Sequence, residues 1–258
     1  MQIRENDTSS LRLIDRETKS FTVSGTPRVQ VETFDGPVTV RSWDKQEVSY
    51  TAIKRARDDQ AMRGIRLRAE QRGSEVFVIA EFDKSLKRLW NTGAVVQLDV
   101  FVPRNANLRA SSGDGRLLVE GINGETDLHT GDGSVDVSGG RGRLRVDTGD
   151  GRIRVTKFDG EVDARTGDGR ITLAGRFTQL AARTGDGSIS LALPADLNVT
   201  IETNAESVIN DGLAVAEDAN TEQRVRRWRV GRGGNVFTLR TGDGRIILQR
   251  ADNTIADQ

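Results

Sequence analysis

Cysteine is absent from the sequence, and histidine occurs once, as His129. Without cysteine there are no disulfide bonds and no thiolate metal sites, and the redox compartment cannot be read from the composition. A single histidine excludes a histidine-rich metal site and, without cysteine, a Cys-His pair, and it leaves a Ser-His-Asp triad strained. We expect His129 to be an incidental surface residue, and we expect no catalytic residue of these classes.

The sequence also has no excess of positive or negative charge and no long apolar run. Lys and Arg together number 38, and so do Asp and Glu. A balanced chain has no net field to attract nucleic acid, so the basic segment Arg224 to Gly234 is interpreted as an edge or capping strand. No apolar run reaches the roughly 18 residues that a membrane span needs. Residues 1–10 are polar, so we expect neither a signal peptide nor a membrane span, and localisation stays open.

Glycine, by contrast, is abundant, with 28 residues, and it recurs in a fixed phrase. Gly-Asp-Gly returns every 18 residues, always with Thr or Ser directly before it, and once more after a longer gap. A short fixed period predicts a solenoid, in which each repeat buries its apolar face against its neighbours. The aspartates of the phrase are Asp114, Asp132, Asp150, Asp168, Asp186 and Asp243.

Alternating apolar residues give the same period. One predicted inward column is Leu117, Val135, Ile153, Ile171 and Ile189, and the next begins two residues later, at Val119. A second set, which includes Leu144, Val162 and Leu180, lies half a repeat away. Strands place alternate side chains on opposite faces, so each repeat consists of two nine-residue halves, each a turn and a short strand. The sequence predicts an all-β fold, a parallel β-solenoid with 18-residue coils.

The expected domain organisation follows from where the 18-residue repeat begins and ends. Residues 1–20 are charged and aperiodic and are expected to form a flexible lead-in, and residues 251–258 a frayed tail. Residues 21–110 are expected to be a β-strand region that caps or starts the solenoid. The solenoid itself is expected over residues 111–250, with irregular coils over 192–235. Whether residues 21–110 form a separate sheet or irregular coils is left open.

The Gly-Asp-Gly phrase has a structural interpretation and a functional one. As a corner, glycine would supply positive φ, Asp would bond nearby amides, and the preceding Thr hydroxyls would bond the turn backbone. The glycines assigned to the turns are Gly113, Gly115, Gly131, Gly133, Gly149, Gly151, Gly167, Gly169, Gly185 and Gly187.

The functional interpretation is a calcium-binding β-roll. Carboxylates stacked about 4.8 Å apart repel one another by about 0.9 kcal/mol per pair in bulk water, so a counter-charge is expected. Calcium-binding nonapeptide repeats share the nine-residue half-repeat but place Asp at both turns, whereas the second turn here has no constant carboxylate. Arginines two residues after the aspartates, such as Arg116, Arg152, Arg170 and Arg245, are a simpler counter-charge. We therefore expect no cofactor and keep the six aspartates as the alternative calcium row.

A polysaccharide-binding or polysaccharide-cleaving β-helix is a second alternative, because glycoside hydrolysis needs only two carboxylates. Such sites need longer loops and aromatic platforms for sugars. The repeat block has short, uniform coils, and its only aromatic residues are Phe158 and Phe177. We therefore expect that the protein is not an enzyme.

Several segments together resemble a known family. They are Val-Glu-Thr-Phe-Asp-Gly-Pro-Val-Thr-Val-Arg-Ser-Trp-Asp (31–44), Ala-Ile-Lys-Arg (52–55), Val-Pro-Arg (102–104) and the Thr-Gly-Asp-Gly-Arg-Ile repeats. They are similar to the bacterial putative-adhesin family with β-strand repeats, domain of unknown function number 4097. The resemblance covers roughly residues 21–250. It implies a right-handed β-helix-like fold in exported or membrane-attached bacterial proteins, and it supplies no catalytic residues.

From these observations we expect a non-enzymatic scaffold of the cell envelope, either adhesin-like or a general interaction module. The outward faces carry rows of Arg, Asp and Ser, which suit a protein or glycan partner through many weak contacts. The sequence specifies neither the ligand nor the oligomeric state.

Overall fold

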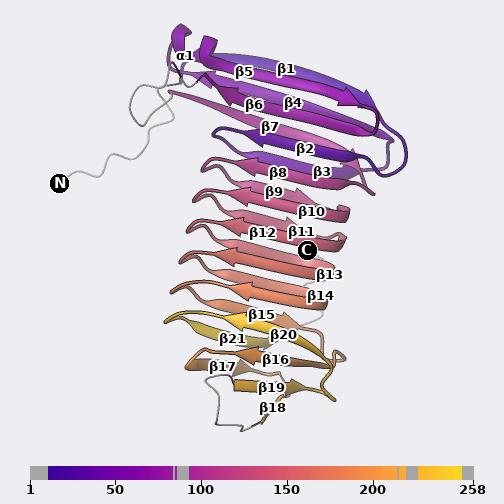
Figure 1. The fold of residues 1–258 in the computed structure, drawn as a ribbon, viewed down its shortest axis with the longest axis vertical. Helices are drawn as coiled ribbons and strands as arrows, with labels where there is room; N and C mark the ends of the chain where they lie inside the picture. Colours follow the sequence, from indigo (N-terminus) through magenta and orange to yellow (C-terminus); the bar gives the residue numbers. More distant parts are fainter. Residues whose placement is uncertain (1–10, 84, 86–92, 214, 219–225, 252–258) are drawn as a thin grey trace, which may run out of the picture.

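A computed structural model of the chain describes residues 11–83, 85, 93–213, 215–218 and 226–251. The strands of these residues form one mixed sheet of 21 members, and they stack into the elongated body seen in Figure 1. The short helix α1 (Asp59–Gly64) begins where the Asp58 carboxylate accepts a hydrogen bond from the Ala61 amide. The prediction of an all-β protein is confirmed. None of the described helices is long and apolar enough to cross a membrane.

Strand pairing arranges the sheet in two rows. The first row runs in the order β5 (Ile65–Arg72), β6 (Glu75–Phe82), β2 (Arg28–Thr33), β8 (Asn107–Ser112), β10 (Asn123–Thr130), β12 (Arg141–Thr148), the second halves of β13 (Ile153–Thr166) and β14 (Ile171–Arg183), β20 (Asn235–Arg240), β16 (Val199–Thr203), β19 (Arg226–Val230) and β18 (Val215–Asp218).

The second row runs in the order β1 (Leu13–Thr22), β4 (Glu47–Ala56), β7 (Ala94–Pro103), β3 (Val38–Trp43), β9 (Leu117–Glu120), β11 (Val135–Ser138), the first halves of β13 and β14, β15 (Ile189–Leu193), β21 (Arg245–Arg250) and β17 (Ser207–Asp211). We call one strand of each row, joined by a turn, a layer; β10 and β11 form one.

The core lies between the two rows, and its columns are those that the alternating pattern predicts. Val135 pairs with Leu117 on one side and Ile153 on the other, in parallel strands. Ile171 and Ile189 continue the column, and all five side chains have no exposed surface. On the other row Leu144 pairs with Val162. Paired residues in this region are 18 apart in sequence, so each layer buries the apolar face of the next.

The order of the layers departs from the order of the sequence at the C-terminal end. Strand β20 pairs with both β14 and β16, and β21 pairs with both β15 and β17. The β20–β21 layer is therefore inserted between β14–β15 and the layer of β16 and β17, which precedes it in the chain. This insertion brings the final Gly-Asp-Gly phrase directly onto the one at Asp186, where Gly242 donates its amide to the Gly185 carbonyl.

At the other end, residues 21–110 continue the same two rows. The β2–β3 layer pairs directly with β8–β9, and β4, β6 and β7 extend the rows beyond it. Strand β1 pairs with β4 along its whole length from Leu13 to Thr22. Ordered structure therefore begins inside the segment expected to be a flexible lead-in, and the correction applies to residues 13–20. The rest of that lead-in up to residue 10, and the tail from residue 252, lie outside the described residues.

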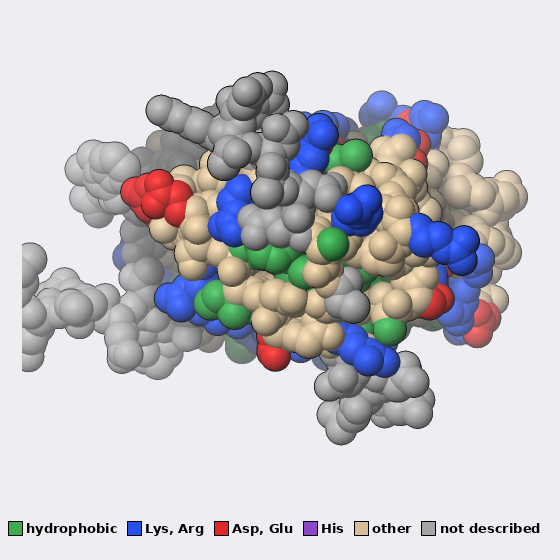
Figure 2. Space-filling model, turned by 90° about the horizontal axis from the view of Figure 1, so that it is seen from below, with side chains coloured by type: hydrophobic (Ala, Val, Ile, Leu, Met, Phe, Trp, Pro, Cys, Tyr) green, Lys and Arg blue, Asp and Glu red, His purple; other side chains and the backbone are tan. Residues whose placement is uncertain are grey.

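The segment expected to be irregular, residues 192–235, supplies most of the strands at the C-terminal end. Strand β19 pairs in antiparallel fashion with β16 and β18, so the basic segment lies near the C-terminal end of the first row, while β18 and not β19 is the edge strand. Arg227 pairs with Glu202 at 2.8 Å, and the Arg226 guanidinium lies 5.2 Å from the Trp228 ring centre. Figure 2 shows this end of the stack, where hydrophobic side chains lie among Lys and Arg side chains.

Candidate functional site

The predicted aspartates form a row along one edge of the stack. All six are exposed. The side chain of each of the first four accepts a hydrogen bond from the backbone amide of the next aspartate in the row. The donor–acceptor distances are 3.4, 3.3, 3.2 and 3.2 Å, from Asp114 to Asp186. Bonding of the carboxylates to turn amides is therefore observed, and the amides belong to the neighbouring layer.

The hydroxyl groups that precede the aspartates form a second row inside the first. Thr148 is buried, and its Oγ1 lies 2.8 Å from the Gly131 carbonyl oxygen and 3.1 Å from that of Gly133, both in the preceding layer. The same pair of contacts recurs at Thr130, Thr166, Thr184 and Thr241. The predicted ladder of threonine hydroxyls is confirmed, and it too joins one layer to the next.

The glycines of the phrase are required for a different reason from the one expected. None of the ten predicted turn glycines has a left-handed φ, so the expectation of positive φ at these positions is wrong. A Cβ atom at Gly133 would instead collide with the carbonyl oxygen of Gly115, and one at Gly151 with that of Gly133. Left-handed glycines occur in the opposite turn, such as Gly139 with a φ of 70°. Glycine in the phrase allows the backbones of successive layers to approach closely.

The arginines that follow the phrase do not neutralise its aspartates as expected. Arg116 Nη2 lies 2.8 Å from Asp136 Oδ2, and Arg152 Nη2 lies 4.0 Å from the same oxygen. Asp136 belongs to β11 and is not part of the aspartate row. Among the residues that the structure describes, no group of three or more His, Asp or Glu side chains is arranged to hold a metal ion.

Asp35, in the related phrase Phe34-Asp35-Gly36, is a seventh member of the row. Thr33 pairs with Ser112, which places Asp35 beside Asp114. Burial is the largest cause that raises the pKa of Asp35, and the charge of Asp114 raises it further, while a hydrogen bond from the Gly36 amide lowers it. This is the one position in the row where like charges and partial burial combine.

The layer at the C-terminal end of the row lacks the phrase, and an asparagine takes over its role. Asn204 Nδ2 donates to the Thr241 carbonyl oxygen at 2.7 Å, and its Oδ1 accepts from the Thr241 amide at 3.1 Å. Sequence reasoning missed Asn204, because its partner is 37 residues away and no repeat marks the position.

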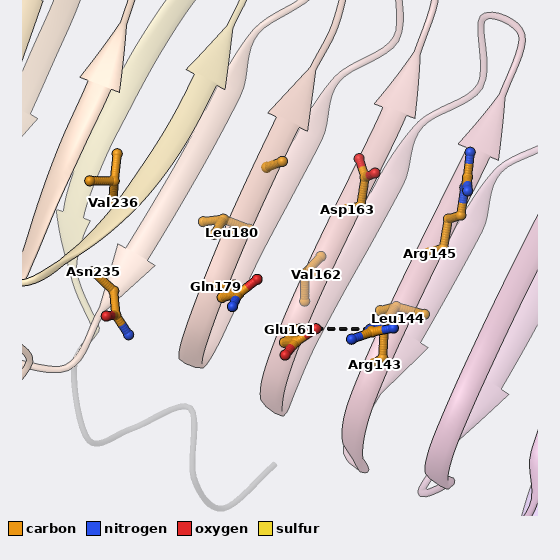
Figure 3. Close-up of a pocket in the computed structure, with 11 residues that line it drawn as sticks. Arg143, Leu144, Arg145, Glu161, Val162, Asp163, Gln179, Leu180, Asn235 and Val236 are labelled. Carbon is orange, nitrogen blue, oxygen red and sulfur yellow. Dashed lines mark hydrogen bonds and ion pairs between the residues drawn. The ribbon is translucent and has the colours of Figure 1, made fainter.

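The second candidate region is the outer surface of the first row, which we call the ladder face. It consists of the outward side chains of β8, β10, β12 and the second half of β13, and pairing in register aligns them in columns across the layers. An open groove of about 550 Å³ extends from this face onto β14 and β20, and Figure 3 shows the side chains that line it, among them Arg143, Arg145, Glu161, Gln179 and Asn235. A surface of this kind can make many polar contacts with an extended partner.

One ion pair crosses that groove. Arg143 Nε donates to Glu161 Oε2 at 2.8 Å, and this hydrogen bond and the charge of Glu161 raise the pKa of Arg143. His129 lies on the same face and is exposed, as predicted, with Nδ1 at 3.4 Å from Asp147 Oδ1. The sequence indicated outward rows of Arg and Asp, but not which of them pair.

Comparisons with known proteins identify the same relatives as the quoted segments do. The family model described as Toastrack DUF4097 matches residues 29–249. No curated protein sequence matches the chain.

Three solved structures resemble the chain over most of its length. A putative cell adhesion protein from Clostridium sporogenes shares 12% identity, with 93% of this chain and 100% of that one covered and a TM-score of 0.42. A putative adhesin from Bacteroides fragilis shares 12% identity, with 91% and 97% covered and a TM-score of 0.43. A putative lipid binding protein from Parabacteroides distasonis shares 14% identity, with 91% and 96% covered and a TM-score of 0.43.

Replacing Thr148 with Val should destabilise the fold. Valine keeps the shape and the β-branch but leaves the Gly133 carbonyl oxygen without the hydroxyl donor, while the Gly131 carbonyl keeps the Gly149 amide; the loss costs about 1–3 kcal/mol of unfolding free energy. Chemical denaturation measures the loss. Thr172→Val, at an outward position of β14, is the matched control and should change stability by less than about 0.5 kcal/mol. Equal effects of the two variants would show that the hydroxyl ladder contributes nothing.

Replacing Asp35 with Asn should stabilise the protein at neutral pH. A carboxyl whose pKa is raised in the folded state binds more protons folded than unfolded, so its contribution to stability falls as pH rises through the folded pKa. The gain from Asn should therefore be present at pH 7 and disappear below the ordinary pKa of Asp, near 4. Thermal melting across pH measures this. The exposed Asp132→Asn is the control; a gain at pH 7 that persists unchanged in acid would contradict the explanation.

Proposed function

Because the chain belongs to the Toastrack DUF4097 family, we propose that it is a non-enzymatic interaction module of the bacterial cell envelope, with an adhesin-like role. The architecture that serves this role is a parallel β-solenoid, right-handed as the family resemblance implies, with one 18-residue coil per layer. The protein acts outside the cytoplasm, where surface modules of this kind meet their partners. A cell-surface protein or a glycan is the proposed partner.

The observation that supports this proposal is the ladder face. Its columns repeat the same outward positions at every layer, about 4.8 Å apart. The groove in Figure 3 is open, and its charged side chains are exposed or half-buried. Exposed ion pairs and hydrogen bonds are individually weak. Repeated along a rigid stack, however, they allow an extended partner to bind through many contacts at once.

Removing charge from the ladder face should therefore weaken partner binding. The double variant Arg143→Ala and Arg145→Ala removes two neighbouring cations of the groove, whereas Arg154→Ala removes an exposed cation from the other row as the matched control. We expect the double variant to bind immobilised cell-surface protein or cell-wall polysaccharide about tenfold more weakly. The control should bind like the wild-type chain.

Retention of these materials by the immobilised chain, measured at several salt concentrations, is the test. Equal binding by the two variants would place the site elsewhere. No retention above bare resin, together with turnover of a cell-wall polysaccharide, would replace the proposal with the polysaccharide-active alternative.

The calcium-binding β-roll remains the other alternative. The carboxylates of the row already accept backbone amides, so calcium is not needed to hold the turns. A ligand that binds only the folded state raises the melting temperature. Because we expect calcium not to bind, the melting temperature should stay the same when calcium and then a chelator are added. A melting temperature that rises when calcium is added would establish the β-roll instead, provided that the chelator reverses the rise and that Asp150→Asn reduces it.

A further inference from the structure

Charge alternates along the ladder face from one layer to the next. In one column Arg109, Asp127, Arg145 and Asp163 follow one another on β8, β10, β12 and β13. In the neighbouring column the order on the last three of these strands is Glu125, Arg143 and Glu161. Acidic β10 and basic β12 therefore lie side by side, and the pattern repeats every two layers, about 10 Å.

Part of this charge has no ion-pair partner among the described residues. Arg143 pairs with Glu161 at 2.8 Å, and Arg165 pairs with Asp163 at 2.7 Å. Arg109, Asp127 and Arg145 form no ion pair with any residue that the structure describes, although all three are exposed. These side chains are available to a partner that presents the opposite charges at the same spacing.

The ladder face itself presents those charges when its layers are read in the reverse order. Consider a second copy facing the first and turned about an axis that runs along the strands, midway between β10 and β12. Asp127 then faces Arg145, Glu125 faces Arg143, and Arg109 faces Asp163, each pair twice. We propose that the ladder face binds a second copy of this chain in this antiparallel arrangement. The inference rests on the proposed function and names its partner.

Two further positions support this register. His129 faces Asp147 of the second copy, and Glu32 of β2 faces Arg183 of β14. Moving the axis to lie between β8 and β10 sets Arg28 against Arg143 and Glu32 against Asp147, which are like charges. A parallel arrangement sets every layer against itself, so that Asp127 faces Asp127. Like-charge contacts discriminate strongly between alternative partners, so the pattern disfavours both of these arrangements.

The strength of this contact follows from its chemistry. Each exposed ion pair contributes little on its own and is screened by salt. Self-association should therefore be weak and should decrease as ionic strength rises, unlike association through apolar surface. Such a contact suits chains that are held at high local concentration on opposing surfaces.

Sedimentation equilibrium of the full chain at low and at physiological ionic strength tests the proposal. The wild-type chain should form dimers that dissociate as salt is added. Asp127→Arg and Arg145→Asp each create like-charge contacts and should each weaken dimerisation by about tenfold or more. Mixing the two variants should restore it, because both positions are then cationic in one variant and anionic in the other, so every facing pair has opposite charges. Arg154→Asp, on the other row, should dimerise like the wild type.

A wild-type chain that stays monomeric at low ionic strength would overturn the inference. So would dimers that survive either single charge reversal, or variants that fail to recover on mixing. Restoration on mixing distinguishes the interface from damage to the fold, which a second damaged copy does not repair. A monomeric chain that still retains cell-surface material would sink this inference alone. A chain that dimerises but retains nothing would sink the proposed function alone.

Discussion

Hydrogen bonding between successive Gly-Asp-Gly turns fixes how each layer sits on the next, and the rest of the molecule depends on that contact. Three groups of the phrase take part: the glycine amide, the preceding hydroxyl and, in the first four phrases, the aspartate carboxylate. All three bond the neighbouring layer, and the hydroxyls of Ser112 and Thr241 also accept an amide hydrogen bond from their own turn. The absence of a side chain at the glycines is what lets the two backbones approach closely enough. The Gly-Asp-Gly phrase therefore joins adjacent layers by hydrogen bonds and also forms the turn between the two strands of a layer.

A fixed offset between layers has consequences on both sides of the sheet. Inside, it holds the apolar residues in columns such as Leu117, Val135 and Ile153, whose burial is the main stabilising term. Outside, it holds charged residues in columns at the same spacing, so the ladder face is a regular array and not a scatter of side chains. The proposed role in adhesion and the proposed self-association both require this regularity, because contacts this weak act only when many are aligned.

Regular features of this structure could be predicted from the sequence, and long-range ones could not. The core columns and the threonine ladder follow from an 18-residue period that any reader of the chain can count. The insertion of β20 and β21 between earlier layers depends on pairing across more than 50 residues, as from Leu180 to Phe237, and no local pattern encodes it. Strand β1 was missed because its residues are charged and mostly exposed, as suits the edge of a sheet.

The candidate sites divide in the same way. Position was predictable for the aspartate row, but partners were not: Arg116 lies two residues after Asp114 and yet pairs with Asp136, 20 residues away. The role of the glycines was also predicted wrongly. Glycine is selected both where two backbones approach closely and where φ is positive, so its presence alone does not tell which of the two applies. On the ladder face, charge alternation becomes visible only when the strands are set in register, since neighbours in a column are 18 residues apart.

Site-resolved hydrogen exchange of the turn amides tests the central claim most directly. The amides of Asp132, Asp150, Asp168 and Asp186 lie in exposed turns, where an unbonded amide exchanges rapidly. If each bonds the carboxylate of the preceding layer, these amides should exchange nearly as slowly as those of the adjoining strands, and far more slowly than the amide of Gly73 at a hairpin tip. Exchange as fast as that of Gly73 would show that the turns do not hold the layers together.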